Sequence, residues 1–157
     1  MKLASRIGEL RPSAIRAAGK LIASKPGCIT FAGGYPASEV MPVEEVVELT
    51  DQLVRDYGRT SMQYGLTKGN DDLMEQIVKL MEKKGIKCGI ENIQITTGSQ
   101  QAIFLTGMLT LDKGDAVVVE NPTYLGALSA YVPYEAEFIG VDADEEGMIM
   151  SELEKTL

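Results

Sequence analysis

The first half of the chain repeats its apolar residues every three or four positions, which is the spacing of one face of an α-helix. This pattern predicts three helices. The first covers residues 13–24 and is capped by Ser13, and the second begins at Pro42 and ends before Gly58. The third follows the capping residue Asn70, and its apolar stripe consists of Leu73, Met74, Ile77, Val78 and Met81.

From residue 92 onward, short apolar runs alternate with helical segments. The pattern predicts strands over residues 93–95, 116–119 and 137–141, an acidic turn over 142–147, and helices over 98–111, 123–132 and 151–157. Strands that alternate with helices predict an α/β layered domain whose sheet is largely parallel. The continuous run of valines within residues 116–119 is typical of a strand that is covered on both faces.

The residue types present exclude several kinds of active site. The 157 residues include no histidine, which removes Ser–His–Asp and Cys–His nucleophile systems, histidine general bases and zinc sites that need imidazole. The two cysteines, Cys28 and Cys88, stand in no paired motif, so we expect neither a disulfide framework nor a metal cluster. A reducing compartment is the simpler interpretation of two such thiols.

The charge distribution bears on the class of partner. The net charge is −8, from 15 basic and 23 acidic residues, and the basic residues form no stripe of the kind that nucleic-acid binding needs. No apolar run approaches the roughly 20 residues that cross a bilayer, and the charges among residues 1–11 do not fit a signal peptide. We therefore expect a soluble, cytoplasmic protein that binds neither nucleic acid nor membranes.

The segment at residues 95–102 places a tight glycine turn between a predicted strand and a predicted helix. The first amides of a helix lack carbonyl partners, and together with the helix dipole they attract anions. Gly98, Ser99 and Gln100 are therefore candidate phosphate ligands, and the Ser99 hydroxyl would add a further donor. The alternative is that Ser99 only caps its helix, and the residues alone leave both interpretations open.

Other candidate residues are individually weaker. Tyr124 follows a predicted buried strand, at the sheet edge where open α/β sheets bind ligands, and its ring either stacks on a flat ligand or packs on the core. Tyr64, in a Gln-Tyr-Gly turn, either faces solvent or meets an anion. Gly34 lets a ligand approach the main chain beside Tyr35, while Arg16 is by default a solvated charge.

Four motifs, in this order and at this spacing, resemble the class I and II aminotransferases, which are pyridoxal-phosphate enzymes of fold type I. They are Phe31–Pro36, Gln63–Gly65, Thr96–Ala102 and Glu120–Tyr124. The resemblance covers the whole chain and points to the branch of 2-aminoadipate, aromatic and branched-chain transaminases. It implies an α/β fold, an incomplete three-layer large domain with an N-terminal helical arm. Residues 1–40 would form the arm and the Gly-Gly substrate loop, and residues 41–157 a partial large domain.

The resemblance also implies how the cofactor is held. Gly98, Ser99 and Gln100 would cradle the phosphate of pyridoxal 5′-phosphate, and Tyr124 would stack on its pyridine ring. Tyr64 would reach the phosphate in the neighbouring subunit, which implies a homodimer.

For the substrate, the resemblance implies that Gly34 and Tyr35 lie against its carboxylate and that Arg16 meets an acidic side chain. The family's cofactor-holding lysine, its aspartate beside the pyridine nitrogen and its carboxylate-binding arginine lie further along than Leu157. No lysine of this chain has the expected context, including Lys113 in its predicted turn. We therefore assign no catalytic residue and no metal ligand.

The chain is accordingly interpreted as the N-terminal part of an aminotransferase that moves an amino group between an amino acid and a 2-oxo acid, as in amino acid metabolism and biosynthesis. We expect it to be inactive in isolation. One alternative is a non-catalytic dimerising or binding remnant of such an enzyme. Another is the aminotransferase-like part of a transcription regulator, which would need a basic DNA-binding domain before Met1. The residues do not identify the substrate amino acid.

Overall fold

The computed structural model describes residues 2–10, 12–29, 31 and 34–157. The chain divides into two compact units: unit 1 consists of Met1–Ala17 and Thr96–Leu157, and unit 2 of Ala18–Ile95. Within the expected Gly-Gly loop, Ala32 and Gly33 lie outside the described residues.

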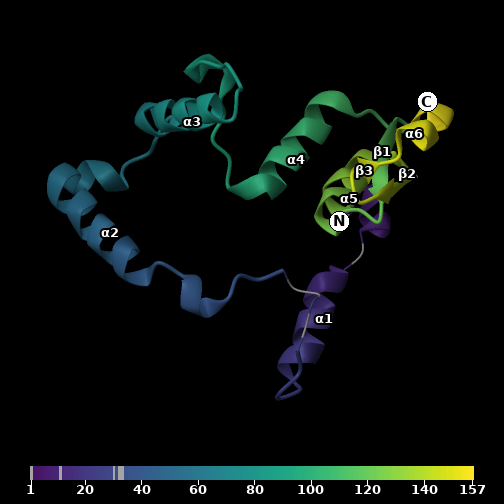
Figure 1. Cartoon of the computed structure of the whole chain (residues 1–157), viewed down its shortest axis with the longest axis horizontal. Coiled ribbons are helices and arrows are strands. Elements are labelled where there is room, and N and C mark those ends of the chain that lie inside the picture. The colour runs from purple at the N-terminus through teal and green to yellow at the C-terminus, as the bar shows by residue number, and fades with distance from the viewer. Residues whose placement is uncertain (1, 11, 30, 32–33) are drawn as a thin grey trace. The chain divides into compact units, whose positions relative to one another are not determined.

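The first two predicted helices are confirmed, with small shifts at their ends (Figure 1). Helix α1 spans Ala14–Ala23, and the Ser13 hydroxyl accepts a hydrogen bond of 3.3 Å from the backbone N–H of Arg16, as an N-cap should. Helix α2 spans Val43–Tyr57, so Pro42 is its capping residue rather than its first helical residue. Gly58 ends α2 with a φ of 54°, in the region that favours glycine.

Helix α3, Asp71–Lys83, begins as predicted and ends at Lys84 as its capping residue rather than at Gly85. The Asn70 side chain accepts a hydrogen bond of 2.9 Å from the Leu73 N–H. The acidic residues of the first turn, Asp71 and Asp72, face the positive end of the helix dipole. On the apolar stripe, Met74 is only 2% exposed and forms the buried centre of unit 2.

Unit 1 contains the sheet. Strand β1 (Ala116–Asn121) runs parallel to β2 (Glu137–Asp144), and helix α5 (Leu125–Tyr131) connects them. The short strand β3 (Gly147–Met148) turns back antiparallel to the end of β2, which gives the order β1-β2-β3. Helix α6 (Met150–Thr156) then packs on β2, at the yellow end of the chain in Figure 1.

Three details of the predicted sheet are wrong. Residues 93–95 are extended but form no strand, because no strand of the described residues pairs with them; instead the Ile95 N–H donates to the Lys68 carbonyl at 3.0 Å. The expected acidic turn at 142–147 is a tight hairpin, since β2 continues to Asp144. The valines of β1 are half-buried rather than buried, so that strand is not fully covered on both faces.

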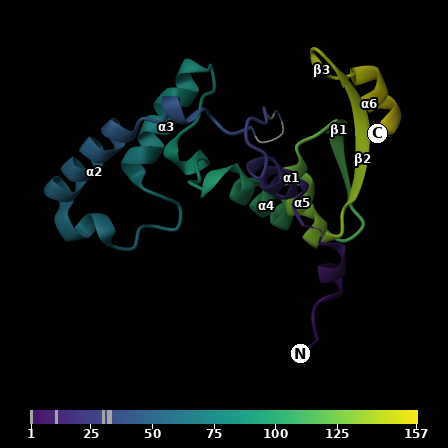
Figure 2. The same ribbon diagram turned by 90° about the horizontal axis from the view of Figure 1, so that it is seen from below.

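Helix α4 (Gly98–Thr110) packs against α5, as Figure 2 shows for the green helices beside the sheet. Gly107 permits the close approach: a Cβ there would lie 2.7 Å from a ring carbon of Tyr131. Tyr134, in the short 3₁₀ helix η5 (Val132–Tyr134), donates its hydroxyl to the Phe104 carbonyl at 3.0 Å. The rings of Phe104 and Tyr134 lie 5.5 Å apart, within the range of a favourable aromatic pair. No helix in the described part of the chain is both long and apolar enough to span a membrane.

Candidate functional site

The first turn of α4 is an open helix end in unit 1. Thr97 is the N-cap residue, but its side chain makes no capping hydrogen bond, and the first turn contains no acidic residue. The Gly98 N–H is satisfied by the Thr96 carbonyl at 2.9 Å. Among the described residues, no backbone carbonyl accepts from the N–H groups of Ser99 and Gln100. Two donors therefore remain at the positive end of the helix dipole.

Local hydrogen bonds fix the turn that precedes these donors. The Thr96 hydroxyl donates to the Gly98 carbonyl at 3.1 Å, and the Gln101 side-chain oxygen accepts from the Thr97 N–H. Gly98 itself has a φ of 71°, a conformation that favours glycine. The Ser99 residue is exposed, and no described residue accepts a hydrogen bond from its hydroxyl. The turn can thus present one hydroxyl and two amides to an oxyanion.

Gln100 and Tyr124 come together through Gly126. The Gln100 side-chain amide donates to the Gly126 carbonyl at 2.9 Å, which joins the first turn of α4 to the first turn of α5. The Tyr124 ring lies over Gly126, because a Cβ on that glycine would overlap the end of the ring. Tyr124 is nevertheless 56% exposed, so much of its surface is open to a ligand. The structure thus brings Gln100 and Tyr124 of the predicted set into one local assembly.

The other predicted residues are described within their own units. Tyr64 in unit 2 is 99% exposed, and its N–H donates to the Gln63 side chain at 2.8 Å. Gly34 has a φ of 60° with open space where a Cβ would stand, and Tyr35 beside it is exposed. Arg16 is an exposed residue on α1.

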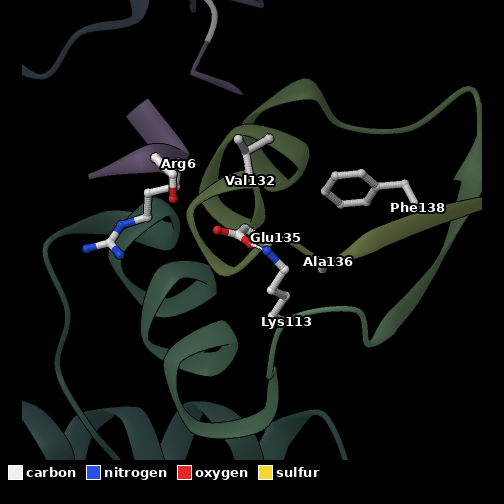
Figure 3. Close-up of a pocket in the computed structure, with 7 residues that line it drawn as sticks. Arg6, Lys113, Val132, Glu135, Ala136 and Phe138 are labelled. Carbon is white, nitrogen blue, oxygen red and sulfur yellow. Dashed lines mark ion pairs between the residues drawn. The ribbon is translucent and has the colours of Figure 1, made fainter. Parts of the chain in front are cut away.

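A cavity of about 490 Å³ lies elsewhere in unit 1 (Figure 3). It is lined by Ser5, Arg6, Lys113, Val132, Glu135, Ala136 and Phe138. The Lys113 ammonium forms an ion pair with the Glu135 carboxylate, and that hydrogen bond raises the pKa of Lys113 above its ordinary value. The residues that line the cavity include none of the α4 turn, and two of its three charged residues, Lys113 and Glu135, neutralise each other. Its size alone does not make it the functional site.

Sequence reasoning missed two residues of the α4–α5 assembly. Gly126 makes room for the Tyr124 ring, and Gln101 closes the turn by binding the Thr97 N–H. A side-chain amide four residues after the capping residue is a recognisable local signal, because it can reach back to the N–H of that residue. The role of Gly126 has no such signal, since it depends on the direction in which the neighbouring Tyr124 side chain points.

The family of the chain follows from comparison with known proteins. The model of the family described as aminotransferase class I and II matches residues 28–157. The chain belongs to the class I and II aminotransferases. This finding confirms the resemblance carried by the four motifs.

Individual aminotransferases resemble the chain along nearly all of its length. Aromatic-amino-acid aminotransferase 1 of Thermococcus litoralis is 40% identical over 149 residues, which cover 94% of this chain and 36% of that protein. The 2-aminoadipate transaminase of Thermus thermophilus is 38% identical over 150 residues, covering 96% of this chain and 36% of that protein. The chain therefore spans about a third of the length of these aminotransferases.

Solved aminotransferases also share the fold. The crystal structure of Pyrococcus horikoshii kynurenine aminotransferase in complex with PMP matches with a TM-score of 0.88 and 38% identity, over 99% of this chain and 38% of that one. The fold is thus the corresponding part of a fold type I aminotransferase, as the α/β prediction implied.

Proposed function

We propose that this chain supplies the phosphate cradle of a pyridoxal-phosphate aminotransferase. The observation that carries the proposal is the open first turn of α4, with two unpaired amides and the Ser99 hydroxyl. In this proposal Gly98, Ser99 and Gln100 bind the phosphate of pyridoxal 5′-phosphate, and Tyr124 contacts its pyridine ring. The residues fit this group. The unpaired donors at the start of α4 can bind a phosphate, and the exposed ring of Tyr124 can contact a flat pyridine ring.

When bound, pyridoxal phosphate supplies the electron sink through which an amino group leaves an amino acid and enters a 2-oxo acid. The residues of this chain bind and orient. A hydrogen bond from the Ser99 hydroxyl or the Gln100 amide to a charged phosphate oxygen contributes about 1.5–3 kcal/mol before association costs. The glycine at position 98 keeps the main chain bare where the anion approaches.

The remaining predicted roles belong to the same proposal. Tyr64 reaches the phosphate bound by a second subunit of a homodimer, which is consistent with its almost complete exposure in one chain. Gly34 and Tyr35 lie against the substrate carboxylate, and Arg16 meets an acidic substrate side chain. The arm at residues 1–40 and the partial large domain at 41–157 form the two functional parts, in a cytoplasmic enzyme of amino acid metabolism and biosynthesis.

The whole protein, in this proposal, acts on amino acids and 2-oxo acids. Support comes from two relatives of the chain, an aromatic-amino-acid aminotransferase and a 2-aminoadipate transaminase. The lysine that attaches the cofactor is not among the lysines of this chain. In unit 1, Lys113 pairs with Glu135 and Lys155 pairs with Glu152 at 2.7 Å. Because no lysine of this chain stands in the sequence context that the family's cofactor lysine has, a second candidate function is a non-catalytic module that binds the cofactor.

The test of the cradle uses two ligands that differ only in the phosphate. Equilibrium dialysis should detect binding of pyridoxal phosphate and much weaker binding of pyridoxal. Ser99→Ala should weaken pyridoxal phosphate roughly tenfold, as expected from the loss of one hydrogen bond to a charged group. Ser38→Ala, an exposed serine of unit 2, is the matched control and should leave the affinity unchanged. Equal affinity for the two ligands would contradict the proposal.

Turnover tests a point that both candidate functions share, the lack of a catalytic lysine in this chain. Pyridoxal phosphate with an aromatic amino acid and 2-oxoglutarate should give no more amino transfer with this chain than without it. Transfer that depends on Ser99 would instead mean that a lysine of this chain carries the chemistry.

A further inference from the structure

The first turn of α5 contains a glycine that ordinary helix energetics disfavour. Gly126 is the second residue of α5, and a helical glycine costs about 1 kcal/mol relative to alanine. An alanine here would meet a particular neighbour, because its Cβ would overlap the Tyr124 ring and hydroxyl. Because the overlapping atoms are the far end of a side chain, a methyl group would displace the ring rather than the helix.

The same glycine is also the point where α5 is tied to α4. Its carbonyl accepts the Gln100 side-chain amide at 2.9 Å, while the backbone N–H of Gln100 is one of the two unpaired donors of the α4 turn. Gln100 thus offers an unpaired main-chain donor at the helix end, while its side chain binds Gly126. A shift of α5 relative to α4 would break this bond and move Tyr124 away from the donors.

We infer that Gly126 and the Gln100 side chain are positioning residues, which hold the Tyr124 ring at a fixed place beside the open end of α4. This inference rests on the proposed function, in which the amides bind a phosphate and the ring contacts the aromatic part of the same molecule. A ring that is already immobilised loses little side-chain entropy when a ligand binds, so the pair recognises an aromatic phosphate as one unit.

The first measurement needs no cofactor. With tyrosine labelled at the ring carbons, carbon NMR gives one signal set for each tyrosine, and Tyr124→Phe assigns that of Tyr124. Gly126→Ala and Gln100→Met should each shift the Tyr124 signal by more than its linewidth and leave the signal of Tyr64 in place. The matched controls are Gly19→Ala, a helical glycine with open space around it, and Gln52→Met on the exposed surface of α2. Both controls should leave the Tyr124 signal unchanged.

The second measurement is the affinity for pyridoxal phosphate by equilibrium dialysis. Gly126→Ala should weaken binding roughly two- to tenfold, the size expected for one aromatic contact, without lowering the Tm, because alanine is the better helix former. Binding of inorganic phosphate should be unaffected by Gly126→Ala.

Each outcome decides one point. An unmoved Tyr124 signal in Gly126→Ala overturns the inference, and so does a moved signal with unchanged affinity. An equal loss of affinity in Gly19→Ala also overturns it, because the effect would not be specific to the ring. If the parent chain binds no pyridoxal phosphate, the proposed function fails, and the inferred role in recognition fails with it. The spectra recorded without cofactor would then still show whether Gly126 determines the position of the Tyr124 ring.

Discussion

Helices α3 and α4 are the same length but begin in opposite ways. At α3, the Asn70 side chain caps the helix and Asp71 and Asp72 stand in the first turn. At α4, the Thr97 side chain makes no capping bond and the first turn contains no acidic residue, so no carboxylate of that turn faces the positive end of the dipole. A helix end that satisfies itself contributes to stability, whereas one that is left open is available for an anion.

We expect the largest effect from exchanging the second residues of the two helices, Ser99 of α4 and Asp72 of α3. The exchange reverses the difference between the two helix starts. Ser99→Asp would place a carboxylate against the open amides of α4, where it would repel a phosphate and occupy its donors. We expect the affinity for pyridoxal phosphate to fall about 100-fold or more, the equivalent of two bonds to a charged group. The helix itself should be stabilised by about 0.5 kcal/mol.

The reciprocal change, Asp72→Ser, is the control for that exchange. It occupies the equivalent place in α3, and it should leave pyridoxal phosphate binding unchanged while slightly lowering the Tm. Equilibrium dialysis and thermal unfolding of both variants report the two properties separately. If Ser99→Asp binds pyridoxal phosphate as tightly as the parent, the open turn of α4 is not where the phosphate sits.

A smaller effect is expected from the caps themselves. Asn70→Ala removes the hydrogen bond to the Leu73 N–H and should lower the free energy of unfolding of unit 2 by about 1 kcal/mol. Thr97→Ala removes a side chain that makes no capping bond, so its effect should stay below about 0.5 kcal/mol. Urea unfolding followed by circular dichroism measures both. Similar losses in the two variants would show that α4 relies on its cap as α3 does.

The contrast between these helices also explains what the sequence could and could not predict. The start of α3 directly after Asn70 and the start of α4 at Gly98 follow from local signals, a capping amide and a glycine turn. The strand predicted at 93–95 was wrong because a strand needs a partner, and pairing is a property of the whole fold rather than of three residues.

The same distinction applies to the site. Ser99 could be singled out because an open helix start is a local feature. The bond from Gln100 to Gly126 joins residues 26 positions apart, and it became visible only once α4 and α5 were packed together. The hairpin at the end of β2 was missed for a similar reason, since the pairing of Asp144 with Gly147 extends a strand through residues that look like a turn.

The smallest expected effect comes from the ion pair between Lys113 and Glu135 in unit 1. Like the start of α3, these charges find their partners within the chain. Glu135 raises the pKa of Lys113 in the folded protein, first through their hydrogen bond and then through charge attraction. Because the pKa of Lys113 is higher in the folded than in the unfolded protein, the pair stabilises the fold fully at a pH below the ordinary pKa of lysine, about 10.4. This stabilisation is lost as the pH rises through the pKa of Lys113 in the folded protein. The urea midpoint of the parent should therefore decline in that alkaline range more than that of Lys113→Met. The difference should shrink at about 1 M salt, because both groups are accessible to screening.

Lys87→Met provides the control for loss of an exposed positive charge, and pyridoxal phosphate binding at neutral pH should be the same in all three proteins. A loss of affinity in Lys113→Met alone would mean that this pair acts on the α4 site and not only on stability.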